Sequence, residues 1–326
     1  MNIGYACLTV GVPGTKQRTC TMKNATPVKL LSLIQSNIEA LNRILDYNIQ
    51  NDIKLFRISS DIIPFGSHSI NKLKWWEIFN DQLNEIGLKA VANGIRLSIG
   101  EKEGIPVVFD NLHHQVNPDN TRSEIEWIAS CRKTWKTEDG RQKLHYSQQN
   151  PHKRPGSHSA ILDIEDFVRF SKCLAKQDID IMVEVKDKNL SAIKCTNAIA
   201  LPKIRRLEKE WERYKYLVLE HSPKLYKEIR KLLKDKRAYP VVEFDRLIDE
   251  ALQAPIKPGN AVNVAQYVWG YFKDTVDIGT RLSFEKKVNK ASMGESTGSM
   301  KRLLWRLTVE QQQRYLLDSL YFMKVM

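Results

Sequence analysis

The feature that most constrains the fold is an alternation of short apolar segments with amphipathic stretches through the first 186 residues. Between several of the apolar segments, the stretches 28–48, 75–86 and 164–176 have apolar side chains at helical spacing. Strands that alternate with helices indicate a parallel sheet, either open or closed as a barrel. The apolar segments have the length and branched side chains of buried strands, and they comprise residues 3–8, 55–58, 95–99, 105–109, 144–146 and 179–185.

One junction breaks this alternation, because only residues 100–104 separate the expected strands 95–99 and 105–109. Consecutive parallel strands need a crossover of a dozen or more residues, so these two cannot be neighbours in one parallel sheet. Residues 101–104 also have the form of a last helical turn with its glycine C-cap, without the body of that helix. We therefore expect a missing stretch near residue 100. An antiparallel hairpin is the alternative, but it leaves the helix-cap pattern unexplained.

After residue 186 the pattern is almost entirely helical. A turn cluster at 255–260 and a small-residue loop at 292–299 interrupt it. We expect an α/β domain over residues 1–188 and a basic all-α domain over residues 200–326. The expected helical stretches are 204–219, 225–233, 241–252, 262–272 and 303–322.

The net charge of +13, most of which comes after residue 186, favours a polyanionic partner such as nucleic acid over a merely basic protein. No apolar run approaches the roughly 20 residues of a membrane span, and the amino terminus lacks the pattern of an export signal. The five cysteines show no paired spacing. These observations predict a cytoplasmic protein, and a DNA partner would place it at the nucleoid.

Six of the seven histidines fall between residues 68 and 158, several at the ends of the expected strands. Asp110 and His113 follow the segment 105–109 and are three residues apart, so one turn can direct both at one metal ion. Carboxylate oxygen with imidazole nitrogen suits Mn, Zn or Fe. The alternative is a surface turn with incidental histidines.

Further candidates accompany other strands. Lys143 and His145 share one face of a strand by its period of two, and a lysine there suits a substrate phosphate or carbamylation into an anionic ligand. Glu184 is a carboxylate in an apolar strand, which fits a metal ligand or an ion pair with a cation such as Lys186. His68 is either a ligand or a capping residue.

The loop 151–158 is basic and rich in turn residues, so Lys153 and Arg154 could grip a phosphate backbone; a plain solvated loop is the alternative. The chain has no Gly-x-Ser-x-Gly elbow, no Walker phosphate loop, no dinucleotide fingerprint and no Cys-x-x-Cys pair. Hydrolysis by a multi-metal cluster is the chemistry that remains.

These motifs resemble the UV damage endonuclease family, in the family's order and over nearly all of residues 1–188. The resemblance implies a (β/α)8 barrel similar to endonuclease IV, expected as a monomer. Its implied activity is nicking of damaged double-stranded DNA directly 5′ of ultraviolet photoproducts and of abasic sites, with two or three metal ions, Mn²⁺ by preference, and no nucleotide cofactor. The matching segments are Gly4-Tyr5, 55–60, 64–68, 109–114, 143–145, 151–158 and 182–186.

The same resemblance assigns roles to single residues. Lys143 corresponds to a lysine that can carry a carboxylate modification beside the metal cluster. Lys143 and Lys186 are the two expected catalytic residues. Tyr5 is expected to line the lesion pocket, and Arg57, Lys153 and Arg154 to bind DNA. The implied metal ligands are His68, Asp110, His113, His145, His158 and Glu184.

The chain departs from the family after residue 98, where the family continues with a His-Pro-x-Gln-Tyr segment. Here Ile99-Gly100 leads directly into residues 101–109, which match a helix end and strand much later in the family. Two to three βα units are therefore absent, and with them two histidine ligands, a glutamate ligand and the Gln-Tyr pair. A barrel that lacks two interior strands cannot close in the usual register.

The carboxy-terminal segments 221–226, 262–273 and 314–322 resemble a YbgA-like helical domain of unknown function. Its aromatic residues at helical spacing fit a core better than a base-stacking platform. Two hypotheses for the whole chain follow: a DNA-repair endonuclease, or a noncatalytic DNA-binding remnant of that family. A metal-dependent sugar isomerase on a related barrel is a third, against which the loop 151–158 and the basic charge argue.

Overall fold

The computed structural model describes residues 1–6, 9–18, 26–58, 86, 88–90, 92–93, 95–99, 106–118, 121–174 and 177–325. The chain divides into two compact units, of which unit 1 comprises Met1–Val10 and Gly14–Ile199, and unit 2 comprises Gly11–Pro13 and Ala200–Met326. No helix of these residues combines the length and the apolar character needed to cross a bilayer.

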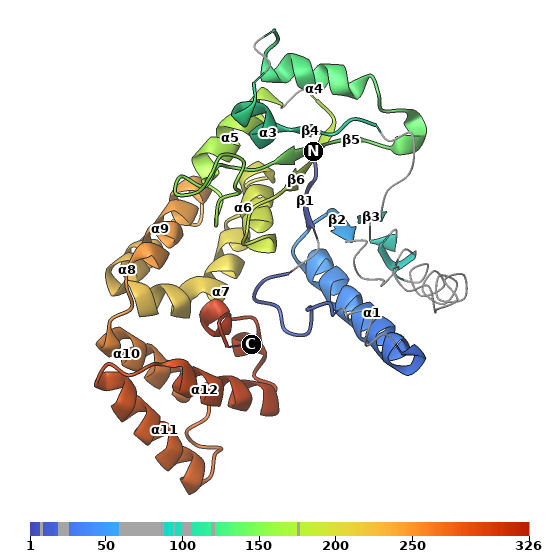
Figure 1. Cartoon of the computed structure of the whole chain (residues 1–326). Helices are drawn as coiled ribbons and strands as arrows, with labels where there is room; N and C mark the ends of the chain where they lie inside the picture. The colour runs from blue at the N-terminus through green and yellow to red at the C-terminus, as the bar shows by residue number, and fades with distance from the viewer. Residues whose placement is uncertain are drawn as a thin grey trace. The chain divides into compact units, whose positions relative to one another are not determined.

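Unit 1 is an α/β structure in which helices follow most of the strands (Figure 1). Its strands are β1 (Ile3–Ala6), β2 (Leu55–Ile58), β3 (Arg96–Ile99), β4 (Phe109–Asp110), β5 (Gln142–Tyr146) and β6 (Ile179–Val183). Its helices are α1 (Pro27–Gln50), α3 (Asn111–Val116), α4 (Glu124–Arg132), the 3-10 turn η3 (Thr137–Asp139), α5 (Ile164–Cys173) and α6 (Asn189–Ile199). The expected helix 75–86 lies outside the described residues except at its last position.

The described strands form one parallel sheet in the order β3-β2-β1-β6-β5-β4. The first strand is central, since Gly4 is in register with Leu55 of β2 and with Met182 of β6. β3 and β4 follow one another in the sequence yet form opposite edges of this sheet, which confirms that 95–99 and 105–109 are not neighbouring strands. This is the strand order of a (β/α)8 barrel opened between β3 and β4.

The middle of the sheet is buried, as in parallel sheets with both faces covered. All five residues of β6 are buried, and the α1 face that carries Ile38, Leu41 and Leu45 is buried as well. Thr26 caps the start of helix α1, since its side chain accepts a hydrogen bond from the Lys29 amide, and Pro27 occupies the first helical position. Apolar burial at helical spacing therefore directs α1 onto the sheet.

The expected strand 105–109 proved too long, because β4 contains only Phe109 and Asp110. Pro106 has no amide hydrogen for a strand ladder. The backbone of Val107 pairs with side chains instead: its amide donates to Thr134 Oγ1 at 2.8 Å, and its carbonyl accepts from Trp135 Nε1 at 2.9 Å. The edge strand is short because side chains satisfy the backbone groups that precede it.

Unit 2 is helical, and its core includes the rings of Phe272, Phe284 and Phe322. The aromatic segments thus serve as core, as their spacing indicated. Its helices are α7 (Ile204–His221), α8 (Pro223–Leu232), α9 (Val241–Gln253), α10 (Pro258–Trp269), α11 (Ile278–Ser292), α12 (Gly298–Glu310), α13 (Arg314–Leu317) and the 3-10 turn η4 (Leu320–Phe322).

The single helix expected over residues 303–322 is wrong. α12 ends at Glu310, and the chain then turns through Gln312, whose φ of 51° is left-handed, before α13 begins. A left-handed residue cannot continue a right-handed helix, so the apolar pattern beyond it belongs to separate short turns. Helix α11 went unpredicted because few of its residues are buried.

A buried ion pair crosses the core of unit 2. Lys301 Nζ lies 2.5 Å from Glu220 Oε2, and the side chains are 8% and 0% exposed. Burial lowers the pKa of Lys301, and the Glu220 carboxylate opposes that shift. The ammonium group also lies 4.3 Å from the centre of the Tyr321 ring. Each charge therefore depends on the other for compensation.

We expect Lys301→Met to lower the free energy of unfolding of unit 2 by about 3–5 kcal/mol, because it leaves the Glu220 carboxylate buried without its cation. The double variant Lys301→Met/Glu220→Leu removes both charges and should recover most of that loss. Urea unfolding of the full chain, followed by circular dichroism, measures both. A double variant no more stable than the single one would contradict this account.

Candidate metal centre

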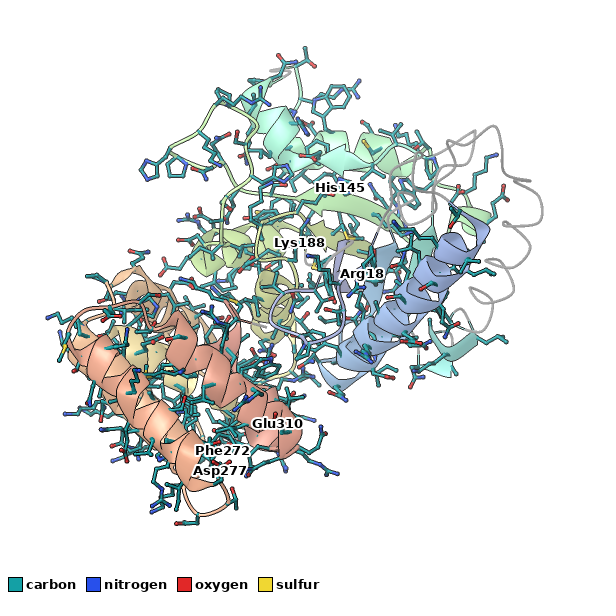
Figure 2. The ribbon with its side chains drawn as sticks, turned by 60° about the horizontal axis from the view of Figure 1, so that its bottom comes forward. Arg18, His145, Lys188, Phe272, Asp277 and Glu310 are labelled. Carbon is teal, nitrogen blue, oxygen red and sulfur yellow. The ribbon has the colours of Figure 1, made fainter. Side chains whose placement is uncertain are left out.

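Three potential ligands converge at the carboxyl ends of β4, β5 and β6. Asp110 ends β4 and is in register with His145 of β5, while Glu184 comes directly after Val183, the last residue of β6. His145 Nδ1 lies 3.5 Å from Glu184 Oε1 and 3.7 Å from Asp110 Oδ2. Figure 2 marks the position of His145 in the sheet. One ligand atom of each residue lies within 4.8 Å of the others, all three side chains being half-buried.

The first turn of α3 orients Asp110. The carboxylate caps this helix by accepting a 3.0 Å hydrogen bond from the His113 amide. Partial burial acts to raise the pKa of Asp110, but the interaction with His145 and the bond from His113 outweigh it, so the pKa lies below its usual value. Asp110 is therefore ionised at neutral pH, as a metal ligand must be.

His158 belongs to the same electrostatic environment. Burial lowers the pKa of its imidazole; Glu184 opposes the shift, Lys186 adds to it, and Asp110 and His113 contribute smaller effects of opposite sign. A bridge to Gln149 fixes its backbone. A neutral imidazole offers a nitrogen lone pair to a metal.

These groups fit a divalent cation. Two carboxylates and an imidazole form a mixed oxygen and nitrogen donor set, which suits Mn²⁺, Zn²⁺ or Fe²⁺. Among the residues that the structure describes, these three would by themselves leave coordination positions of an ion open for further ligands or for substrate. His113 itself is exposed, and its backbone rather than its ring is what contacts Asp110.

The loop that leads to His158 is held by one glutamine side chain. Gln149 Nε2 donates to the carbonyl of Asn150 at 2.7 Å and of Arg154 at 3.1 Å, and its Oε1 accepts from the Gly156 amide at 2.8 Å. Lys153 and Arg154 are exposed on this loop. The loop is thus internally hydrogen-bonded and presents two cations to solvent.

Asn111 is a positioning residue that the sequence interpretation missed. It is buried, its Nδ2 donates to the Ser147 carbonyl at 3.0 Å, and its Oδ1 accepts from the Ser147 amide at 2.7 Å. Asn111 adjoins Asp110, and Ser147 lies two residues beyond His145, so this pair locks two ligand-bearing segments together. An asparagine directly after a strand-end aspartate was the available signal.

Lys143 and His145 share a face of β5, on which both are half-buried. Lys143 Nζ lies 5.9 Å from the centre of the Trp135 ring. Lys186 is exposed, and its amide donates to the carbonyl of Ser159, the residue after His158, at 3.1 Å. Both lysines therefore lie on segments that also carry the candidate ligands.

Tyr5 is fully buried, and its hydroxyl donates to Asn48 Oδ1 at 2.8 Å and contacts Thr9 Oγ1 at 3.0 Å. Its ring packs edge-on against Phe56 at 5.2 Å. Burial raises its pKa far above the ordinary value. The side chain of Arg57, in β2, and the whole of His68 lie outside the described residues.

Comparison with known proteins gives two family matches. A family described as UV-endonuclease UvdE matches residues 1–100 and 95–215, and a protein family of unknown function, DUF1722, matches residues 215–324. The helical family confirms the expected fusion of an endonuclease-like region to a domain of unknown function. Together the first two stretches cover more than half of the chain.

Individual relatives agree. The UV DNA damage endonuclease of Clostridium perfringens is 28% identical over 386 aligned positions, which cover 89% of this chain and 92% of that protein. The protein of the same name from Bacillus mycoides is 29% identical over 161 positions, covering 45% and 50%. A solved structure, described as SacUVDE, matches with a TM-score of 0.47 and 24% identity, covering 61% of this chain and 98% of that one.

The comparisons also locate the missing stretch. The clostridial alignment has 386 positions, whereas 89% of this 326-residue chain is about 290 residues, so about 96 positions hold residues of the relative alone. The two stretches of the family match meet at residues 95–100, where β3 ends. These findings confirm the shortening inferred from the short junction at residue 100.

Replacing Asn111 tests the link between the two segments. Asn111→Ala leaves the buried Ser147 amide and carbonyl without partners, so we expect a loss of about 2–4 kcal/mol in the stability of unit 1. Asn111→Asp keeps the acceptor and loses the donor, and should be intermediate in effect. Urea unfolding of the full chain measures the order, and equal stability of all three proteins would refute it.

Proposed function

The chain belongs to the UV-endonuclease family, and from this premise we propose that it is a metal-dependent DNA-repair endonuclease. It nicks damaged double-stranded DNA at the phosphodiester 5′ of an ultraviolet photoproduct, and also at abasic sites. The observation that carries this proposal is the convergence of Asp110, His145 and Glu184 from three successive strand ends. Active-site residues of parallel α/β folds lie at this edge.

In this proposal Asp110, His145 and Glu184 hold a divalent cation, Mn²⁺ by preference, with His158 and His113 as further ligands. The bound cation supplies Lewis-acid chemistry that stabilises the charge developing on a phosphodiester and activates water. The ionised Asp110 gives the site its negative charge, and the Asn111–Ser147 pair holds the ligand-bearing segments in position. His68 belongs to the same proposed ligand set.

DNA contacts follow from the exposed cations around this centre. The charge of Lys186 acts on the His158 imidazole and lowers its pKa. Lys153 and Arg154 are exposed on the loop that the Gln149 side chain holds. These three cations suit phosphates on either side of the scissile bond. Lys143 beside the cluster and Arg57 as a DNA contact complete the proposed site, whereas Tyr5, expected to line the lesion pocket, is fully buried and has no exposed surface for a lesion.

The second candidate is a noncatalytic DNA-binding remnant. The shortening near residue 100 favours it, because the resemblance places two histidine ligands, a glutamate ligand and the Gln-Tyr pair in the absent segment. A site with fewer ligands holds fewer ions. The two candidates share the basic loop and differ in whether damaged DNA is cut.

Metal binding is the first test. Titration calorimetry of the full chain with Mn²⁺ should show binding that His145→Ala weakens by at least about 10-fold, since even outer-shell losses cost that much. His152→Ala is the matched control, because His152 is an exposed histidine on the neighbouring loop. Equal affinities for the two variants would exclude a metal centre at His145.

Nicking is the second test. The full chain with Mn²⁺ is mixed with ultraviolet-irradiated and with unirradiated supercoiled plasmid. We expect open circles from the irradiated plasmid only, abolished by EDTA and lowered at least about 100-fold by Glu184→Gln. His152→Ala should cut like the native protein. Salt-sensitive binding without damage-dependent nicking would establish the noncatalytic remnant instead.

A further inference from the structure

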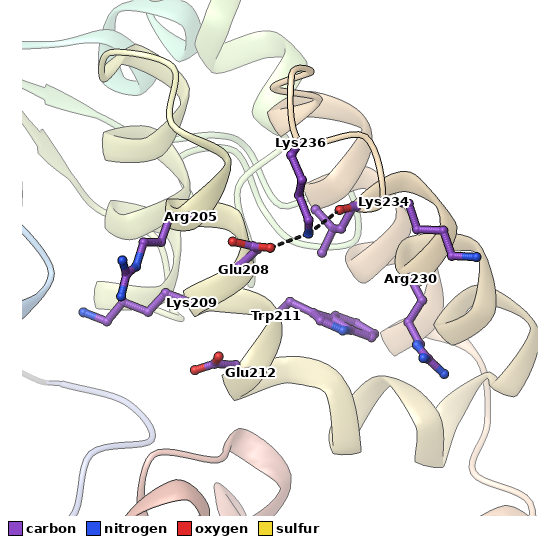
Figure 3. Close-up of a pocket in the computed structure, with 9 residues that line it drawn as sticks. Arg205, Glu208, Lys209, Trp211, Glu212, Arg230, Lys234 and Lys236 are labelled. Carbon is purple, nitrogen blue, oxygen red and sulfur yellow. Dashed lines mark hydrogen bonds and ion pairs between the residues drawn. The ribbon is translucent and has the colours of Figure 1, made fainter.

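Unit 2 carries an open pocket between α7 and the end of α8, which we call the α7–α8 pocket (Figure 3). Its volume is about 690 Å³. Its lining residues come from both sides of residue 215 in the sequence, the position at which the two family matches meet. Neither family description assigns the pocket a role. It belongs to a unit separate from the metal centre.

The lining of the α7–α8 pocket is basic. Five cations and two acidic residues, Glu208 and Glu212, line it, and Glu208 forms an ion pair with Lys236. Arg205 and Lys234 are exposed and form no ion pair with any residue of the described stretch 177–325. The remaining cations are Lys209 and Arg230. A net positive lining of this kind attracts phosphates.

An aromatic surface lies within this ring of charge. Trp211 is half-buried, and its ring lies 5.3 Å from that of Tyr226 at a tilt of 43°. The Arg230 guanidinium lies 5.7 Å from the centre of the Tyr226 ring, so this cation also packs against the aromatic pair. Figure 3 shows Trp211 with Arg205 and Lys209 of α7 on one side and Arg230 and Lys234 on the other.

We propose that the α7–α8 pocket binds single-stranded nucleic acid, with phosphates on Arg205 and Lys234 and a base stacked on Trp211. Basic grooves that contain an aromatic ring are the usual means of holding an unpaired strand without sequence preference. The pocket is open, which lets a polymer continue past the bound nucleotide. In a duplex the bases are stacked on one another and offer no face to Trp211.

The test uses the full chain in EDTA, so that no nicking occurs, and a fluorescent 12-residue oligothymidylate as the probe. Trp211→Leu keeps an apolar side chain but removes the ring, and should weaken binding at least about 5-fold, whereas Trp211→Phe should stay within about 3-fold. Trp211→Leu should leave the affinity for a duplex of equal length unchanged. Thermal unfolding of each variant checks that it is folded.

Charge is tested with a matched pair of variants. Arg205→Gln/Lys234→Gln should lower the slope of log Kd against log salt by about 1.4, because each phosphate contact on a single strand contributes about 0.7. Lys273→Gln/Lys286→Gln changes the net charge equally with exposed cations outside the pocket, and should leave the slope as it is.

Three results would overturn the proposal, and the first two are a folded Trp211→Leu variant that binds the oligothymidylate like the native chain and equal losses for the two double-glutamine variants. Displacement of the oligothymidylate by inorganic polyphosphate from the native chain and Trp211→Leu with equal potency would also overturn it, since phosphates alone would then be recognised. His145→Ala should bind the probe normally, so failure of the endonuclease proposal leaves this test intact.

Discussion

The pairing of β1 with β6 is the interaction on which unit 1 depends. It joins the first strand of the unit to its last, with Ile3 in register with Ile181, and Asn2 reinforces it by hydrogen bonds of 3.3 and 3.2 Å to the buried Asp180. Without it, β2 and β3 would be separated from β4, β5 and β6. The carboxyl ends at which Asp110, His145 and Glu184 meet are aligned within the second group, by the parallel pairings of β5 with β4 and with β6.

The sequence predicted the parts of the fold that follow from hydrophobic period and chain connectivity. Alternating patterns identified the parallel sheet, and the short junction at residue 100 predicted that β3 and β4 could not be neighbours. The site was partly predictable for the same reason, since Asp110, His145 and Glu184 stand at strand ends. The hydrogen bonds between Asn111 and Ser147 were not predictable from the sequence. They depend on which loops face each other, and no local pattern specifies this.

The errors have local causes. Strand 105–109 shortened to two residues because Thr134 and Trp135, more than 20 positions away, satisfy the backbone of Val107. The helix expected over residues 303–322 is interrupted at Gln312, which adopts a left-handed backbone conformation. Residues other than glycine rarely adopt it, so the sequence alone did not predict it. Tertiary contacts shortened the strand, and a single backbone angle divided the helix. In neither case does the apolar pattern of the sequence contain this information.

The glutamine brace of the basic loop has a kinetic consequence. Gln149 fixes the loop backbone through several hydrogen bonds within the protein, so Lys153 and Arg154 are already displayed when a polyanion arrives. The conformational entropy of ordering that backbone is lost during folding rather than during association. A pre-ordered loop of this kind favours rapid capture by charge, with the lifetime of the complex governed by how well the two side chains fit the phosphates they meet.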